Sequence, residues 1–357
     1  MKNYRKSLLV ALLLVVVVSL TVFAQAPLSN NMPAGGVLGQ TNFVLKATGK
    51  TPSAMNNAFG VAVDPATGKL FVADRNNNRV LRFSSAGKLV NGSAAEAALG
   101  QPDDTTNTSG LSAVKMNTPT RVYVDAAGRL WVSDYGNRRV LRFDGASAKA
   151  TGAAADGVLG QPDFVTNTAG TTAAKMTRTT GLFVDGGGRL WVAERDNNRV
   201  LRFDNAAAKA NGANADGVLG QPDFVTGTGG LSATKMAEPF GVFVDASGRL
   251  WVSEDVNNRV IRFDNAAGKA NGAAADGVLG QPNFTTNTFS TTQNGTGNVR
   301  GVWGDGRGRL YLVEEGNHRI LIFNNAATLA NGANADNVLG QATFTSGLGA
   351  DPPTVSS

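Results

Sequence analysis

A unit of sixty residues recurs along this chain of 357 residues, and that recurrence restricts the possible folds more than any other feature. The tripeptide Leu-Gly-Gln appears six times, beginning at Leu38, Leu99, Leu159, Leu219, Leu279 and Leu339. An aspartate closes a β-rich segment with the same period, at Asp64, Asp125, Asp185, Asp245 and Asp305. The one extra residue of the first unit falls in its turn Pro65–Gly68, where an insertion leaves the strand register intact. A unit of this size cannot bury its apolar faces by itself, and equal units therefore stack on one another. The sequence thus predicts a repeat architecture.

Each unit contains four short segments with the composition of β-strands. In the fourth unit they are Gly241–Asp245, Arg249–Ser253, Arg259–Phe263 and Gly277–Gln281, and an alanine-rich stretch before the last of them predicts one or two helical turns at Asn265–Gly272. The second strand carries an aromatic residue in every unit: Phe71, Trp131, Trp191, Trp251 and Tyr311. The strands are apolar almost throughout, as expected where both faces of a sheet are buried. Four-stranded meanders at a fixed period are typical of β-propeller blades.

The number of blades follows less directly. Five units contain all four strands, but the first Leu-Gly-Gln segment, Val37–Phe43, has no strands of its own before it. We therefore expect an all-β fold, a five-bladed propeller in which the N-terminal strand joins the ring where the first and last blades meet. A six-bladed ring and an open arc closed by a second chain are the alternatives.

The third strands and the turns before them resemble the NHL repeat. The phrases are NNRVLRF at Asn77–Phe83, DNNRVLRFD at Asp196–Asp204 and VNNRVIRFD at Val256–Asp264. The resemblance covers about residues 35–345, and the VLGQPDF strands make each unit longer than a common NHL repeat, as in an exported bacterial branch of that family. It implies propeller blades, usually six to a ring, that bind protein and, in some animal proteins, RNA. Related propellers include lactonases of the gluconolactonase type, which hold a divalent cation, and a peptidyl amidating lyase with a multi-histidine zinc site.

The first 26 residues have the pattern of an export signal. Three basic residues precede the apolar run Leu8–Leu20, and the triplet Ala-Gln-Ala at 24–26 provides the small residues that a signal peptidase requires. We expect a secreted, periplasmic or cell-surface protein, with membrane contact only if the signal segment stays uncleaved as an anchor. The expected division is a signal peptide at 1–26, an N-terminal segment with a closing strand at 27–44, the propeller at 45–345 and a C-terminal tail at 346–357.

Composition removes several classes of function. The chain has no cysteine and a single histidine, His318, so it lacks thiolate ligands and the multi-histidine zinc site of the lyase. The net charge is +6, but residues 1–26 hold three of the 33 basic residues and none of the 27 acids, which leaves 30 − 27 = +3 for the remainder. Without a concentrated basic run, binding of nucleic acid is not expected.

Residues that recur in every unit are interpreted as structural, because one active site needs only one set. The arginine that opens each third strand is expected to pair with the acid that closes the second: Arg79 with Asp74, Arg139 with Asp134, Arg199 with Glu194, Arg259 with Glu254 and Arg319 with Glu314. The strand-closing aspartates are expected to accept N–H bonds in the following turn. A turn role is expected for Asn77, Asn137, Asn197, Asn257 and Asn317, because asparagine tolerates left-handed conformations and bonds its own backbone. His318 is interpreted as a turn substitution, with a general base as the alternative.

Positions that differ between the units are the candidates for ligand binding. They lie just before the first strand and just after the second, on loops that in propellers converge at one end of the channel, here called the loop face. Aromatic and arginine side chains on a rigid scaffold are typical anchors of a binding surface, and ordinary loop variation is the alternative. The candidates are Asn57, Phe59, Arg75, Thr120, Arg121, Tyr135, Arg178, Thr180, Arg195, Glu238, Phe240, Asp255, Arg300, Glu315 and His318.

Taken together, these features predict an exported, non-enzymatic binding platform for a protein or carbohydrate ligand, monomeric and without a cofactor. One alternative is a metal-assisted hydrolase or lactonase, in which carboxylates and amides would hold a divalent cation. The other is a structural or assembly module, in which the unpaired terminal strand joins another chain by strand addition.

Overall fold

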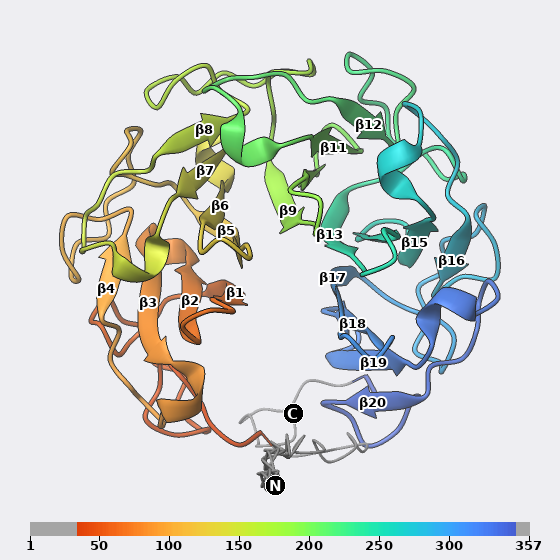
Figure 1. Cartoon of the computed structure of the whole chain (residues 1–357). Helices are drawn as coiled ribbons and strands as arrows, with labels where there is room; N and C mark the ends of the chain where they lie inside the picture. The colour runs from red at the N-terminus through yellow and green to blue at the C-terminus, as the bar shows by residue number, and fades with distance from the viewer. Residues whose placement is uncertain (1–33, 348–357) are drawn as a thin grey trace, which may run out of the picture.

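The computed structural model describes residues 34–347, which form five four-stranded antiparallel sheets around a central channel (Figure 1). In each sheet the strands follow one another in chain order, from the innermost strand at the channel to the outermost at the rim. The expected five-bladed all-β propeller is confirmed. The signal peptide expected at 1–26 lies outside the described residues.

The strands fall into four concentric sets. The innermost strands are β1 (Ala58–Val63), β5 (Pro119–Val124), β9 (Thr179–Val184), β13 (Pro239–Val244) and β17 (Val299–Gly304). The second strands are β2 (Lys69–Asp74), β6 (Leu130–Asp134), β10 (Leu190–Glu194), β14 (Leu250–Glu254) and β18 (Leu310–Glu314). The third strands are β3 (Arg79–Ser85), β7 (Arg139–Phe143), β11 (Arg199–Phe203), β15 (Arg259–Phe263) and β19 (Arg319–Phe323). The outermost strands are β4 (Ala97–Leu99), β8 (Gly157–Leu159), β12 (Gly217–Leu219), β16 (Gly277–Leu279) and β20 (Asn337–Leu339), and the blades are numbered 1 to 5 in chain order.

Among residues 34–347, helical structure is limited to single 3₁₀ turns. Two follow the second strand, η1 (Arg75–Asn77) and η3 (Tyr135–Asn137), and five precede the outermost strand: η2 (Ala86–Lys88), η4 (Ala146–Ala148), η5 (Ala206–Ala208), η6 (Ala266–Gly268) and η7 (Ala326–Thr328). The helical turn expected within Asn265–Gly272 is therefore confirmed as one 3₁₀ turn. Within residues 34–347 there is no apolar helix of sufficient length to cross a membrane.

The aspartate at the end of each innermost strand shapes the turn to the second strand. In blade 2, Asp125 accepts bonds from the backbone N–H groups of Ala127 (3.0 Å) and Arg129 (3.1 Å) and from the indole N–H of Trp131 (3.0 Å). Gly128 completes the turn at φ 74°, a conformation that glycine adopts without strain. The expected role of these aspartates is confirmed, and the bond to Trp131 explains why an aromatic with an N–H group suits the second strand.

A buried ion pair joins the second and third strands of every blade, as expected. Arg139 Nε lies 2.7 Å from Asp134, and both side chains are fully buried. The two terminal nitrogens of Arg139 donate to the carbonyl oxygens of Ser112 (2.9 Å), Lys115 (2.8 Å) and Phe164 (2.7 Å). One guanidinium therefore fixes a hairpin and two long loops. The other pairs are Arg79–Asp74 (2.8 Å), Arg199–Glu194 (2.5 Å), Arg259–Glu254 (2.8 Å) and Arg319–Glu314 (2.7 Å).

The recurring asparagine lies in the turn, as expected, and the left-handed conformation belongs to the residue after it. Asn137 is buried, and its amide donates to Asp134 (2.8 Å) and to the carbonyl of Gly110 (2.9 Å), so it steadies the ion pair. The positive φ falls on Asn78, Arg138, Asn198, Asn258 and His318. His318 is exposed at φ 50°, which agrees with its interpretation as a turn substitution.

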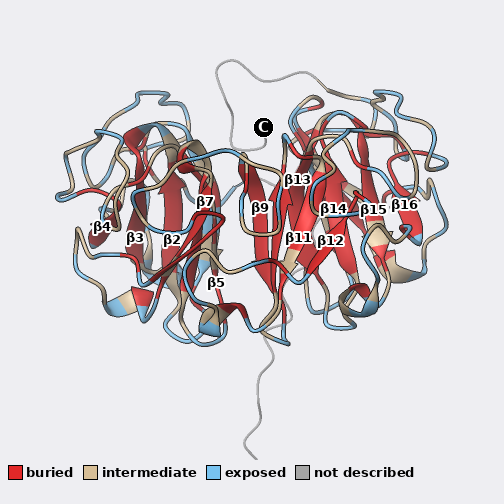
Figure 2. Ribbon diagram, turned by 90° about the horizontal axis from the view of Figure 1, so that it is seen from above, coloured by how far each residue is buried: buried red, intermediate tan, exposed pale blue. Residues whose placement is uncertain are grey.

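The core consists of the apolar faces between blades, and most buried residues lie on the strands (Figure 2). Among the described residues, apolar clusters join blade 1 to blade 2, blade 2 to blade 3, and blades 3, 4 and 5 to one another. The fourth cluster, on the other face of blade 1, contains no residue of blade 5. Figure 1 shows the corresponding separation between β1 and β2 on one side and β18 and β19 on the other. The described ring therefore has a gap between its last and first blades.

The N-terminal segment differs from its expected structure. Residues 37–43 form bends and a turn instead of a closing strand. The segment lies against blade 1, where Val37 N–H donates to the side chain of Asn91 (2.9 Å). Among the described residues no third strand lies beside it, so it has no ladder partner.

Loss of one guanidinium from a buried pair should destabilise the whole fold. Arg199→Leu leaves Glu194 buried without its cation and three loop carbonyls without a donor, so we expect the free energy of unfolding to fall by about 3–5 kcal/mol. The control Arg178→Leu removes an exposed arginine 3.6 Å from Asp196, and should cost less than about 1 kcal/mol. Urea unfolding followed by circular dichroism measures both. Equal losses in the two variants would contradict the assigned role of the buried pair.

Stability should also depend on pH through blade 5. Burial raises the pKa of Glu314 from 4.5 to about 7, against the lowering effect of Arg319 and Asn317. The folded chain then holds a proton between these two pH values that the unfolded chain releases, so this contribution is complete below pH 4.5 and is lost as the pH rises through 7. We expect the decline in unfolding free energy from about pH 5 to about pH 8 to be smaller in Glu314→Gln than in the natural chain. Identical declines would refute this assignment.

Candidate functional site

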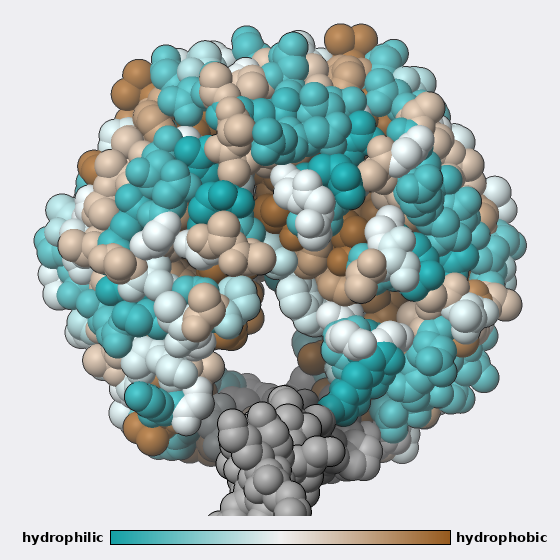
Figure 3. Space-filling view, viewed as in Figure 1, coloured by the Kyte–Doolittle hydropathy of each residue, from teal (hydrophilic) through white to brown (hydrophobic). Residues whose placement is uncertain are grey.

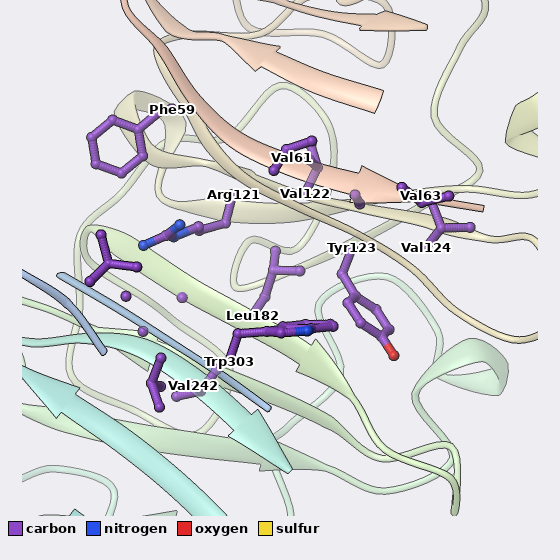
Figure 4. Close-up of a pocket in the computed structure, with 16 residues that line it drawn as sticks. Phe59, Val61, Val63, Arg121, Val122, Tyr123, Val124, Leu182, Val242 and Trp303 are labelled. Carbon is purple, nitrogen blue, oxygen red and sulfur yellow. The ribbon is translucent and has the colours of Figure 1, made fainter. Parts of the chain in front are cut away.

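The innermost strands enclose a cavity of about 470 Å³ in the central channel (Figure 4). Its walls are mainly aliphatic, with Val61, Leu182 and Val242 among them, and Arg121 is the one charged side chain in the described lining. Figure 3 shows the hollow at the centre of the ring, with hydrophobic residues on its walls. A volume of this size lies within the range of small-molecule sites.

Four aromatic side chains gather at one end of the cavity, and we call them the aromatic quartet: Tyr123, Phe183, Phe243 and Trp303. Neighbouring rings have centroid separations of 4.6–6.4 Å. Each lies two residues before the turn aspartate of its innermost strand, where blade 1 has Ala62. Burial raises the pKa of Tyr123 to about 12, and Asp125 and Asp185 add to the effect. Trp303 keeps half of its surface accessible.

The other end of the cavity, at the loop face, carries alternating guanidinium groups and aromatic rings. Each guanidinium carbon lies 5.4–5.8 Å from the centroid of the next ring, within the range of cation–π attraction. The rings of Phe59 and Phe240, from blades 1 and 4, meet at 5.8 Å. We call this set the arginine–aromatic ladder, and it runs through Arg178, Tyr135, Arg75, Phe59, Arg121, Phe240 and Arg300.

The arginines of the loop face differ in their charge partners. Arg195 pairs with Glu238 (2.8 Å) and Arg300 with Asp255 (3.1 Å) and Glu315. Arg75 and Arg121, here called the unpaired arginines, have no described carboxylate within ion-pair distance.

The unpaired arginines have few hydrogen-bond acceptors among the described residues. Arg121 donates to the carbonyl oxygen of Arg300, across the channel. Its burial in the channel lowers its pKa to about 10, so it remains a cation at neutral pH. The Nε of Arg75 is buried and has no hydrogen-bond partner. Both guanidiniums lie over the ring of Phe59, at 5.5 Å and 5.4 Å.

Many of the predicted site residues lie close together in the structure, and others are buried in the channel wall. All seven members of the ladder were among the residues predicted from the sequence. Asn57, Glu315 and His318 are exposed, and Arg195 and Glu238 are half-buried. Thr120 and Thr180, in contrast, are buried in the channel wall: Thr180 Oγ donates to the carbonyl of Pro239 (2.9 Å), and Thr120 Oγ lies 3.1 Å from Ser133 Oγ. These two hydroxyls hold neighbouring strands together and present nothing to a ligand.

Sequence reasoning missed the aromatic quartet. Its signal was available, because four units have an aromatic residue at the same strand position where the first unit has Ala62. The position was overlooked because recurring residues were interpreted as structural. Within residues 34–347 there is no group of three or more acidic or histidine side chains that could hold a metal ion.

Comparison with known proteins supports an NHL-repeat β-propeller. The NHL repeat family model matches residues 56–83, which include β1, β2 and most of β3. NHL repeat-containing protein 3 of Mus musculus is 31% identical over 102 residues, or 28% of this chain and 25% of that protein, so the chain spans about a quarter of the length of this curated relative.

The chain is also similar to solved structures at low sequence identity. A chain in a nidogen/laminin complex superposes with a TM-score of 0.51 at 13% identity, covering 80% of this chain and 85% of that one. A streptogramin B lyase gives a TM-score of 0.47 at 12% identity, covering 80% and 69%.

Accessibility of the cavity should be measurable through tryptophan fluorescence. Of the four tryptophans, Trp131, Trp191 and Trp251 are at most 2% exposed and Trp303 is 50% exposed. We expect acrylamide, a neutral quencher, to quench one fraction of the emission readily, and we expect that fraction to vanish in Trp303→Phe. If the variant retained it, the channel end at the aromatic quartet would not be open as described.

Proposed function

We propose that the protein is an exported, non-enzymatic binding platform whose loop face holds the carboxylate groups of a ligand, carried either by an acidic protein segment or by an acidic carbohydrate. The observation that supports this most is the pair of unpaired arginines on the ring of Phe59. Two cations at one aromatic ring, with no described acid to neutralise them, form a site suited to an anion. A guanidinium donates two parallel hydrogen bonds to a carboxylate, which makes it suited to this ligand.

The scaffold supports recognition because it orients the guanidiniums before the ligand arrives. Phe59 and Arg121 lie on innermost strands, and Arg75 lies in η1, directly after β2. Stacking on aromatic rings limits the rotamers of the arginines, so less side-chain entropy is lost on binding. Glu238 and Asp255 are engaged by Arg195 and Arg300, so their charge is compensated locally.

Export and the absence of a cofactor remain part of the proposal and rest on the sequence pattern of residues 1–26 and on composition. The alternative of a metal-assisted hydrolase gains no support from the described residues, because the cavity lining contains no carboxylate and no described acid cluster provides a donor set. Binding of nucleic acid is not part of the proposal.

Binding of acidic polymers tests the proposal. The probes are poly-L-glutamate for a protein ligand and polygalacturonate for a carbohydrate ligand, with uncharged dextran as the reference, measured by isothermal titration. We expect at least one acidic probe to bind and dextran not to bind, with weaker binding at about 0.5 M salt because the attraction is electrostatic. The probe that binds identifies the ligand class.

Charge-removing variants locate the site. Arg75→Gln and Arg121→Gln should each raise Kd by about tenfold or more, the loss expected for one charge-assisted contact. The matched control is Arg307→Gln, which removes the same charge from the exposed turn between β17 and β18 and should leave Kd unchanged. Equal effects of all three variants would indicate attraction by net charge alone, and absence of binding by both acidic probes would overturn the proposal.

A further inference from the structure

The segment 37–47 has the local structure that the outermost strand and its loop have in a complete blade. Gly92 N–H donates to the carbonyl of Val37 (3.2 Å), and Val37 N–H donates to Asn91. The same two bonds join blade 2 to blade 3, where Gly212 N–H donates to the carbonyl of Val158 (3.0 Å) and Val158 N–H to Asn211 (3.0 Å). In complete blades the residue that makes these two bonds lies on an outermost strand, β8, β12 or β16, which is part of a sheet. Residues 37–39 belong to no sheet.

The loop after this segment repeats the pattern as well. Asn42 Oδ1 accepts the N–H groups of Val44 and Leu45 (both 3.1 Å), as Asp163 Oδ1 accepts those of Val165 and Thr166 in blade 2. Gly39 has φ 81°, close to the 83–88° of the Leu-Gly-Gln glycines of blades 1 to 4.

Among the described residues, the side chain of Gln40 donates one of the two hydrogen bonds that the equivalent Gln161 donates. Its amide donates to the carbonyl of Ala47, seven residues on, as Gln161 donates to Thr168. Gln161 also donates to the carbonyl of Arg138, in the turn before the third strand of its own blade (3.0 Å). Among the described residues, Gln40 has no such second acceptor. Segment 37–47 therefore makes the bonds of an outermost strand and its loop, although among the described residues no inner strands lie beside it.

The face of blade 5 that looks toward this position is apolar and incompletely buried. Val313 is 41% exposed, whereas the equivalent residues of the four other blades are fully buried. Tyr311, Ile320 and Leu339 are half-buried, although their equivalents in blades 1 to 4 are at most 4% exposed. None of these four residues belongs to a described apolar cluster.

The facing side of blade 1 shows the complementary pattern. Val61 and Val63 on β1 are 64% and 48% exposed, whereas the equivalent residues of β5 and β13 are at most 6% exposed. Farther out, Leu81 and Phe83 are fully buried, next to Leu38 of the segment. Burial is thus lost where inner strands would pack and kept where the outer segment lies.

Blade 5 also lacks one polar contact that its neighbours make. In blades 1 to 4 an arginine of the third strand donates to a carbonyl in the 3₁₀ turn of the next blade, as Arg262 donates to Ala327 (2.9 Å). The equivalent residue of blade 5 is Ile322. If the segment beginning at residue 37 formed the outermost strand of a sixth blade, no 3₁₀ turn would connect it to a third strand. An arginine at position 322 would then find no carbonyl acceptor.

From these observations we infer that the gap between blades 5 and 1 accepts a three-stranded antiparallel meander of apolar strands from outside residues 1–357, which pairs with residues 36–38 and completes a sixth blade. The occupant needs three strands because the fourth is already in place. It presents small or β-branched apolar residues to Val313 and Ile320 on one face and to Val61 and Val63 on the other. The sequence holds six Leu-Gly-Gln segments but five copies of the inner-strand pattern, so the meander comes from outside these 357 residues. This inference does not depend on the ligand proposed for the loop face.

A variant that supplies the meander in cis tests the inference. A copy of residues 226–263, which contains β13, β14 and β15, is placed directly after Thr345, the position equivalent to residue 225. If the gap accepts it, Tm should rise by about 5 °C or more, since a new apolar interface forms on each side. The added strands should also resist protease digestion. The same segment added in trans as a peptide should give a one-to-one complex in native mass spectrometry.

Two further variants separate insertion from non-specific stabilisation. Val313→Asp alters an exposed residue, so it should leave Tm of the unextended chain nearly unchanged but abolish the gain of the extended one. Leu38→Pro removes the N–H equivalent to that of Leu159, which is paired with Val140 of the third strand in blade 2, and should also abolish the gain. An added segment that leaves Tm unchanged and is digested overturns the inference. A stable homodimer of the unextended chain that is lost in Val313→Asp overturns it too, because the occupant would then be a second copy.

Discussion

The buried arginine–carboxylate pair is the interaction on which each blade depends. A sheet of four short strands has few ladder bonds at its outer edge, and the long loops of each blade lie outside the strands. The guanidinium of Arg139 meets both needs, because it neutralises Asp134 and also binds three loop carbonyls. The carboxylate alone would be expensive to bury, and the arginine alone equally so, which makes the two residues interdependent. Asn137 completes the arrangement by donating to the same carboxylate.

The period of the sequence carried most of the information about the fold. Strand positions, the turn aspartates and the arginine pairs were predictable because each is a local pattern copied five times, so chance coincidence is excluded. The residue of the turn that adopts the left-handed conformation was not predictable, because Asn occurs at both Asn77 and Asn78 and only the geometry shows that it is Asn78. The sequence could not predict whether residues 37–43 form a strand, since this depends on whether a third strand lies beside them.

The candidate site was predictable only in part, for a physical reason. Positions that differ between units are not required by the repeated structure. All members of the arginine–aromatic ladder lie at such positions and were predicted for this reason. This criterion could not show that Thr120 and Thr180 turn into the wall, because threonine suits both a strand interior and a loop. Nor could it reveal that Phe59 and Phe240, 181 residues apart, share a contact across the channel. Such contacts arise because the blades are arranged around one channel, and this arrangement leaves no trace in any single unit.

The range of the contacts within each blade has a consequence for how the chain folds. The bonds that Arg139 makes to loop carbonyls connect residues 24–27 positions apart, and the bonds between neighbouring blades connect residues about sixty positions apart. Contacts of such short sequence separation form early, because little chain entropy is lost in closing them. Each blade can therefore mature as soon as its last loop leaves the ribosome and then serve as a template for the next. In the described chain no apolar cluster joins the last blade to the first. Synthesis and folding can therefore advance together from the first blade to the last.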